Sequence, residues 1–271
     1  MKSHGGVWLF SQTIIPIFMV GSLLFGNGVA QTAHGQGKGK VIPAANTERA
    51  ALDEALAHLH EARRNFTAVK DYACTLVSQE RVRGKLEEQN VMQFKMKTEP
   101  FSVHMRWLAP KKSAGQEVAF ILGKNNNKMR VKSNVIGGKL IGFISIDPND
   151  PRVLQHSNHN ILEAGIGNMI EQNIRHWDLA RRVGKSKAAL SETKFNGRDC
   201  IRIEVTAKER TPQCYCYRSV IFLEKNSKFP IRLENYDWPR EGGARGGDLI
   251  EAFSYYNLEF NRGLKDAEFN K

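Results

Sequence analysis

Cysteine is scarce in this sequence, with four among 271 residues and none before Cys74. An exported form of the chain therefore lacks a cysteine near its N-terminus for the lipid attachment that bacterial lipoproteins require, which favours a soluble protein. In an exported chain, four cysteines favour disulfides, and three pairings are possible. The candidate residues are Cys74, Cys200, Cys214 and Cys216, and the sequence does not choose among the pairings.

Recognised catalytic and cofactor-binding motifs are also missing. The sequence contains no G-x-S-x-G elbow, no G-x-G-x-x-G pattern and no H-E-x-x-H motif. We therefore expect a protein that is not an enzyme and has no cofactor. A hydrolase is an alternative that rests only on histidines and scattered carboxylates.

A metal site needs more ligands than a single segment supplies. His156 and His159 lie three residues apart with Glu163 nearby, and they bind a metal ion only if a further ligand converges on them from elsewhere. The sequence alone does not reveal such a ligand, so no metal site is expected.

Long apolar runs are absent except near the N-terminus. The run from Val7 to Phe25 is interrupted by Pro16, and it is shorter than the roughly 20 apolar residues that a spanning helix needs. Lys2 precedes it and small residues follow, which is typical of a signal peptide over residues 1–30 with cleavage after Ala30. We therefore expect a flexible leader at 31–45, one domain at 46–271, and a location in the periplasm or outside the cell.

The domain combines two helical patterns with many strand patterns. Apolar residues recur at helical spacing from about 46 to 69 and again from about 162 to 182. Between and after these segments the period changes to two, as in Val103, Met105 and Trp107, with turn signals between the runs. The predicted fold is α+β: a strongly curved antiparallel sheet, an incomplete β-barrel, with helices covering one face.

Such a sheet encloses an apolar groove, and aromatic residues in the strands are candidates to bind a ligand there. The alternative is that these side chains simply fill a core. The candidates are Phe94, Phe101, Trp107, Phe120 and Phe222.

The net charge of +12 favours acidic partners such as lipid head groups or polyanionic polymers. Glu117 is the sole acidic residue between Ser102 and Lys139, so this stretch carries much of the excess. Nucleic acid is not expected as a partner, because no recognition motif is present. The predicted contacts to anionic head groups are Arg106, Lys111, Lys112, Lys128, Arg130 and Lys132.

Several short motifs together resemble the DUF1571 domain family of exported planctomycete proteins. They span about residues 50–271 and comprise DYACTLV at 71–77, QER at 79–81, PFSV at 100–103, GQEV at 115–118, EAGIG at 163–167, YNL at 256–258 and GLKDAEF at 263–269.

The resemblance implies a fold related to the LolA and LolB lipoprotein carriers, in which an incomplete barrel with a helical lid shelters acyl chains. It brings no set of catalytic residues. We therefore expect a soluble carrier that binds a lipid or an acylated lipoprotein in the groove, with the basic stretch meeting an anionic membrane surface. The alternative is a cell-envelope interaction module that binds an anionic polymer or a protein partner through its basic surface.

Overall fold

The computed structural model describes residues 48–133, 142–153, 155–212 and 214–271. The predicted signal peptide and leader lie outside these residues. Two α-helices are described, α1 (Glu48–Phe66) and α2 (Ile166–Val183). Short 3₁₀ turns are η1 (Asn125–Asn127), η2 (Ile161–Glu163) and η3 (Asp266–Glu268).

Helix α2 begins later than the sequence pattern predicts. Leu162 and Glu163 belong to η2, where the Asn160 side chain accepts a hydrogen bond from the backbone N–H of Leu162. Gly165 then takes a φ of +97°, which breaks the chain away from helical geometry just before Ile166. The helix ends at Val183, and Gly184 after it has the left-handed φ of +72° that is common after helices.

Strands occupy about half of the remaining described chain. Those before α2 are β1 (Asp71–Val82), β2 (Lys85–Leu86), β3 (Asn90–Lys97), β4 (Ser102–Ala109), β5 (Glu117–Ile121), β6 (Met129–Lys132) and β7 (Ile144–Ile146). Those after α2 are β8 (Ser186–Phe195), β9 (Arg198–Ala207), β10 (Arg218–Glu224), β11 (Pro230–Tyr236) and β12 (Leu249–Phe260).

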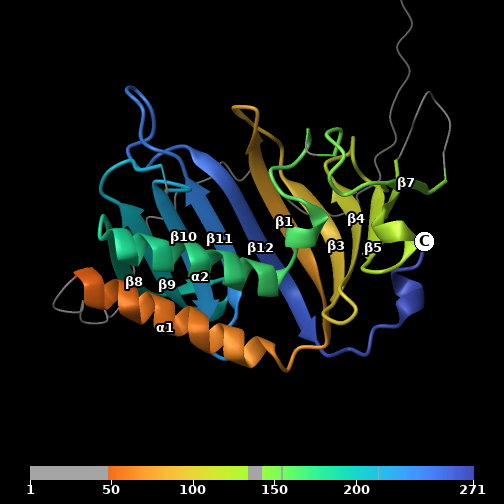
Figure 1. The fold of residues 1–271 in the computed structure, drawn as a ribbon, viewed down its shortest axis with the longest axis horizontal. Helices are drawn as coiled ribbons and strands as arrows, with labels where there is room; N and C mark the ends of the chain where they lie inside the picture. Colours follow the sequence, from red (N-terminus) through yellow and green to blue (C-terminus); the bar gives the residue numbers. More distant parts are fainter. Residues whose placement is uncertain (1–47, 134–141, 154, 213) are drawn as a thin grey trace, which may run out of the picture. The chain divides into compact units, whose positions relative to one another are not determined.

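All of these strands belong to one antiparallel sheet, as Figure 1 shows. The order across it is β7-β6-β5-β4-β3-β1-β12-β11-β10-β9-β8, and β2 pairs with β1. Because the path ends at β7 and β8, the sheet is not closed. The α+β class with an open, curved antiparallel sheet is confirmed.

The two long strands β1 and β12 join the parts of the sheet that come before and after α2. Their pairing sets Glu80 of β1 directly opposite Glu251 of β12. Along β1, Tyr72, Cys74 and Leu76 are buried on the core face, and alternation brings Glu80 onto the same face.

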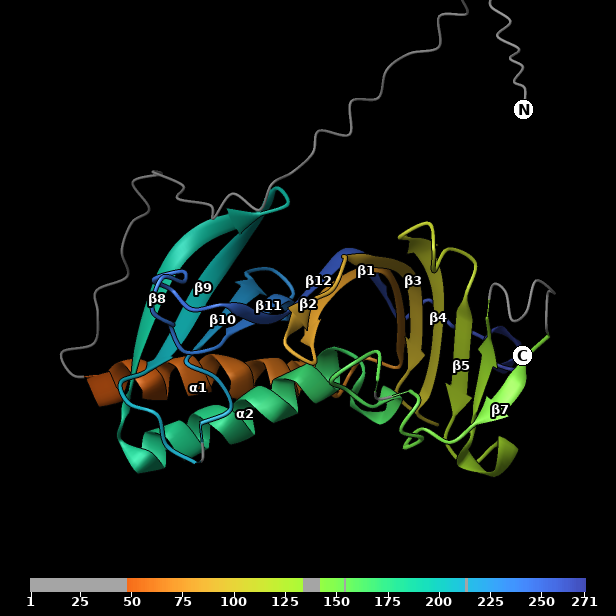
Figure 2. The ribbon, with the colours of Figure 1, turned by 90° about the horizontal axis from the view of Figure 1, so that it is seen from above.

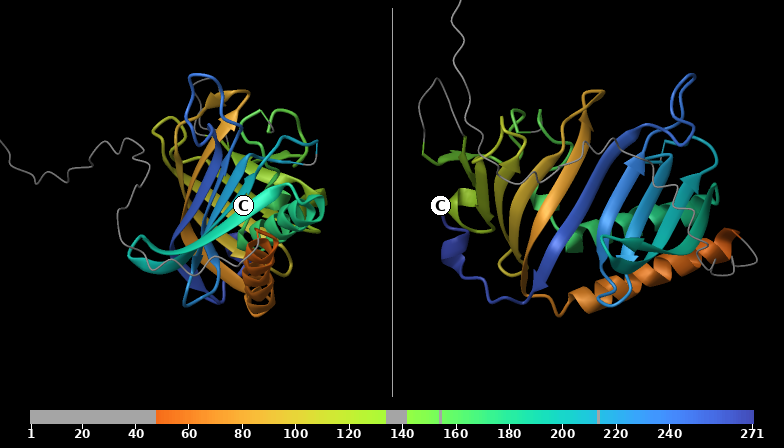
Figure 3. Two further views of the ribbon diagram at one scale, coloured as in Figure 1. Left: turned by 90° about the vertical axis from the view of Figure 1, so that its left-hand side faces the viewer. Right: turned by 180° about the vertical axis from the view of Figure 1, so that it is seen from behind.

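Both helices lie on the concave face of the sheet, side by side (Figure 2). From behind, the strands pass in front of α2 (Figure 3). Apolar residues of α1 and α2, among them Leu59, Ile170 and Trp177, pack in one cluster with Ile203 and Leu223 of the sheet. Among the described residues, no helix has the length and apolar character needed to cross a membrane.

The expected disulfides are not found, since all four cysteines are free. Cys74 on β1 and Cys200 on β9 are four strands apart, about 19 Å along the sheet at the usual strand spacing. A disulfide needs Cα atoms within about 7 Å. Cys214 and Cys216 lie together before β10, where a bond between them would be strained. The sheet order, which the sequence does not show, separates Cys74 from Cys200.

Candidate functional site

A cavity of about 1420 Å³ lies against the concave face of the sheet. Strands β1, β3–β7, β11 and β12 supply its wall, and the first half of α2, Val153 and the segment from Gln155 to Gly165 close around it. The apolar part of its lining includes Leu76, Met92, Met105, Trp107, Val118, Met129, Val131, Ile146, Met169, Leu233, Phe253 and Tyr255. Many of these side chains, such as Met105 and Trp107, are only partly buried.

Polar and charged side chains gather at one part of this lining. Glu80 and Glu251 project into it from β1 and β12, and they are 9% and 2% exposed. Like charges directly opposite on neighbouring strands destabilise a sheet unless something between them compensates. At this point the sheet therefore carries two carboxylates on a core face that is otherwise largely apolar.

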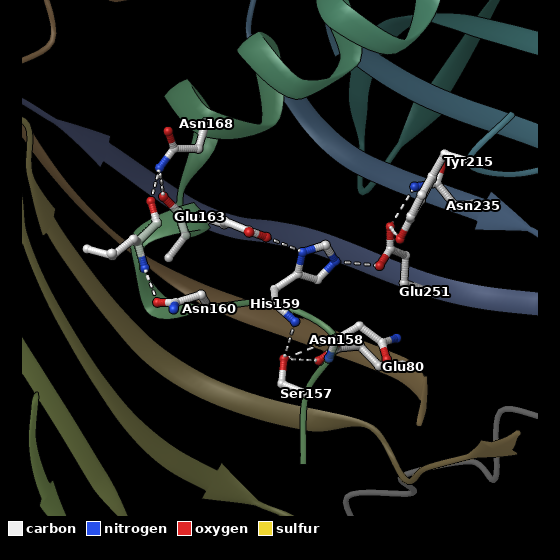
Figure 4. A network of polar contacts seen from close by, with 12 residues as sticks. Glu80, Ser157, Asn158, His159, Asn160, Glu163, Asn168, Tyr215, Asn235 and Glu251 are labelled. Carbon is white, nitrogen blue, oxygen red and sulfur yellow. Dashed lines mark hydrogen bonds and ion pairs between the residues drawn. The ribbon is translucent and has the colours of Figure 1, made fainter. Parts of the chain in front are cut away.

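The compensating group is His159, which reaches the two strands from the segment before α2 (Figure 4). Its Nε2 lies 2.6 Å from Oε2 of Glu251, and its Nδ1 lies 2.8 Å from Oε2 of Glu163. Its ring also packs edge-on against Phe253, with the ring centres 5.6 Å apart. The imidazole is thus held between a deeply buried carboxylate and a half-exposed one.

Further donors orient each carboxylate. The Tyr215 hydroxyl and the Asn235 amide donate to Oε1 of Glu251 at 3.0 and 2.6 Å. The Ser157 hydroxyl and the backbone N–H of Asn158 donate to Oε1 of Glu80 at 3.1 and 2.9 Å. These bonds leave Oε2 of Glu251 directed at His159, as Figure 4 shows.

The cluster shifts the pKa values of its members in different directions. Burial raises the pKa of Glu80. Burial opposes ionisation of Glu251 too, but its bonds to His159, Asn235 and Tyr215 outweigh that effect and lower its pKa. For His159, burial is likewise outweighed, because Glu251 and Glu163 raise the pKa to about 9. At neutral pH the cluster therefore holds an imidazolium against ionised Glu251.

The five predicted groove aromatics occupy different places. Trp107 lines the cavity, and its indole N–H donates to the Asn90 side chain at 3.1 Å. Phe94 and Phe120 are 1% and 2% exposed and sit within the core cluster, and Phe101 packs on Phe120.

The fifth aromatic, Phe222 on β10, contacts Phe195 of β8 rather than the cavity lining. Only Trp107 thus keeps the predicted contact with the cavity. Its role in binding stays a prediction.

The residues predicted to contact anionic head groups also lie in different places. Lys112 lines the cavity, where Arg81, Arg152 and Arg175 join it. Arg106 follows Met105 on β4, and Arg130 and Lys132 flank Val131 on β6, so alternation turns all three to the convex face. Lys111 and Lys128 are exposed and are not part of the lining. Three of the six predicted head-group residues are therefore on the other face of the sheet from the cavity, and one lines it.

Sequence reasoning missed Glu80 and Glu251. It set His159 aside for want of a further ligand, and the fold brings two carboxylates to it from distant strands. A signal for Glu80 was present in the sequence, because every second residue of β1 faces the core and Glu80 occupies one of these positions. Nothing in the sequence pairs that residue with Glu251, which depends on the register of β1 with β12.

Comparisons with known proteins give one family and several distant structures. A family model described as "Protein of unknown function (DUF1571)" matches residues 69–271. Comparison with curated proteins yields no match.

Among solved structures, an uncharacterized conserved protein from Thermus thermophilus is 10% identical, with a TM-score of 0.46 over 80% of this chain and 93% of its own. Lipoprotein LppX of Mycobacterium tuberculosis is 7% identical, with a TM-score of 0.43 over 79% and 98%. A LolA superfamily protein from Nitrosomonas europaea is 11% identical, with a TM-score of 0.35 over 80% and 97%. Likenesses this distant carry no argument about function, which has to come from the cavity itself.

Proposed function

This chain belongs to the DUF1571 family, and we propose that it is a carrier whose cavity shelters the acyl chains of a lipid or of an acylated lipoprotein. The observation that carries the proposal is the cavity of about 1420 Å³ on the concave face, with an apolar wall. Pockets for small molecules usually measure about 300–1,000 Å³, so this one has room for a larger ligand.

The kind of side chain in the wall also supports an acyl ligand. Four methionines line the cavity: Met92, Met105, Met129 and Met169. Methionine is flexible and polarisable, and it adapts to apolar ligands of varying shape. Burial of acyl chains against such a wall contributes about 25 cal/mol for each Å² removed from water.

The proposed carrier is not an enzyme, since transport needs binding and release but no bond cleavage. The proposal includes export directed by the predicted signal peptide, so that the carrier works in the periplasm or outside the cell.

A substitution in the wall tests the proposal. Trp107→Asp places a charge in the cavity and is expected to weaken binding of a fluorescent fatty acid at least tenfold, because the charge must lose water when the chain enters. Leu108→Asp is the matched control, because Leu108 is the next residue on β4 and is 46% exposed on the convex face. Equal binding by both variants, each with a normal circular dichroism spectrum, would contradict the carrier.

Direct detection of cargo is the second test. Native mass spectrometry of protein purified without detergent, followed by organic extraction, is expected to show a co-purifying lipid or acylated peptide. A protein that carries none and takes up no fatty acid would favour the second candidate function.

That second candidate is an envelope module that binds an anionic polymer through its convex face. The placement of Arg106, Arg130 and Lys132 on that face favours it. Surface binding of this kind weakens steeply as salt rises, whereas acyl burial does not. Binding measured from low to high salt therefore separates the two functions.

A further inference from the structure

We propose that Glu80, His159 and Glu251 form a binding site for one divalent transition-metal ion, best matched by zinc. The proposal rests on the polar cluster alone and is independent of acyl binding. One nitrogen of His159 and one oxygen of each carboxylate all lie within 4.8 Å of one another. Small side-chain rotations bring such a set to the bond lengths of about 2.0–2.2 Å that zinc makes with imidazole and carboxylate.

The burial of the two carboxylates is the first argument. Glu80 and Glu251 face each other across neighbouring strands, at 9% and 2% exposure, on a core face that is otherwise largely apolar. Buried charges are normally paired or bound to a metal. A proton on Nε2 of His159 neutralises part of this charge, and a divalent ion at the same point neutralises both carboxylates.

The groups around the three ligands are the second argument. Glu163 lies 2.8 Å from Nδ1 of His159, which fixes the ring so that Nε2 faces Glu251. A carboxylate behind a histidine in this way is the usual support of a histidine that binds zinc. On Glu251, Tyr215 and Asn235 bind Oε1 and leave Oε2 for the metal.

The position of the cluster gives the metal an open side. All three ligands line the cavity, so the remaining coordination positions face it. Sites with three protein ligands and an open position bind water or an oxygen of a ligand. The imidazole nitrogen favours zinc and similar transition metals over magnesium and calcium, which prefer ligand sets made of oxygen alone.

The test is zinc content after equilibrium dialysis, measured by inductively coupled plasma mass spectrometry. Free thiols also bind zinc, and Cys214 and Cys216 are partly exposed. The measurement therefore uses the full chain with Cys214→Ser and Cys216→Ser as the reference. We expect one zinc per chain, and a loss of affinity of more than tenfold in His159→Gln and in Glu251→Gln.

Two further variants guard against a loss that comes from unfolding or from another histidine. Glu163→Gln changes a half-exposed residue behind His159 and is expected to weaken zinc binding about 10- to 100-fold. Glu117→Gln alters a second glutamate–histidine pair, with His104 at 3.1 Å, and should leave zinc binding unchanged. Absence of zinc from the folded reference protein, or equal affinity in the reference and in Glu163→Gln, would overturn the site.

Discussion

On β10, Ile221 and Leu223 are fully buried in the cluster that the helices share with the sheet, whereas on β4, Met105 and Trp107 are only partly buried. We call strands β8–β10, which supply no residue to the cavity lining, the covered half of the concave face, and strands β3–β7 the open half. Side chains of the same apolar character thus make a packed core in one half and the wall of a cavity in the other. What differs between the halves is the cover, not the strands.

Lengths explain why the cover is incomplete. Eleven strands at the usual spacing span about 48 Å along the sheet. Helix α2, with 18 residues, is about 27 Å long, and α1 packs beside it rather than extending it. A pair of helices this short cannot shield the whole concave face, and Figure 2 shows both helices under one part of the sheet. The cavity is lined mainly by strands outside that part.

The largest expected effect tests whether the covered half carries more of the stability. Leu223→Ala removes a fully buried side chain and is expected to lower the free energy of unfolding by about 2–5 kcal/mol. Met105→Ala in the open half should lower it by about 1 kcal/mol or less, because part of that side chain already contacts solvent. Urea unfolding followed by circular dichroism measures both. Equal losses would show that the open half is packed as tightly as the covered half.

The next effect concerns Gly165, where the chain enters α2. A Cβ atom there would collide with the sulfur of Met96 and lie 2.7 Å from the Tyr72 hydroxyl, which also accepts the backbone N–H of Ile166 at 2.8 Å. Gly165→Ala is expected to cost about 3 kcal/mol through strain and this clash. Gly184→Ala is the control, since its φ is also positive but nothing lies within 4 Å of the added atom.

Backbone strain alone then costs about 1–2 kcal/mol at Gly184. Thermal unfolding of the two variants measures the difference. If Gly184→Ala destabilises the protein as much as Gly165→Ala, the close contacts with Met96 and Tyr72 do not hold the start of α2 against the sheet.

The features that could be predicted from the sequence are those that depend on residues close together in the chain. Period-two runs such as Val103, Met105 and Trp107 correctly indicated strands, and the same alternation already implied that Arg106 faces away from Trp107. The start of α2 was predicted too early, because the apolar spacing continues through Leu162 while Gly165 breaks the helix.

The cluster around His159 could not be predicted in this way. It needs the pairing of β1 with β12, which brings together residues from opposite ends of the domain. The free cysteines have the same explanation, since Cys74 and Cys200 are separated by the order of strands and not by anything near them in the chain. Local periodicity determines elements, and long-range register determines the site.

Larger side chains also test whether the covered half is packed more tightly than the open half. Ile203→Phe adds volume to a fully buried position of the covered half and is expected to cost about 1–3 kcal/mol. Val118→Phe projects into the cavity and should leave stability unchanged within about 0.5 kcal/mol. It should also reduce fatty-acid uptake, because it occupies space that the acyl chain needs. Destabilisation by Val118→Phe as large as that by Ile203→Phe would mean that the cavity has no room to spare.

The smallest expected effect concerns charge pairing on the convex face, where each half has a glutamate beside basic side chains. Burial raises the pKa of Glu204 on β9, but bonds from Arg202 and Arg218 outweigh it and lower the pKa below the ordinary 4.5. The pKa of Glu117 on β5 is lowered in the same way, against the effect of burial, by His104 and Lys132. A lowered pKa in the folded state stabilises the protein above pH 4.5, and the stabilisation is lost as pH falls through the folded value.

Glu204→Gln and Glu117→Gln should therefore each lose about 1 kcal/mol or less at pH 7, and the difference from the unaltered protein should vanish toward acid pH. Glu204 should show the larger loss, because it faces two guanidinium groups, whereas burial lowers the pKa of His104 and leaves Glu117 with Lys132 as its charged partner. Urea unfolding across this pH range measures both differences. A loss that stays constant as pH falls would show that these residues act through packing and not through charge. The covered and open halves would then not differ in charge pairing on the convex face.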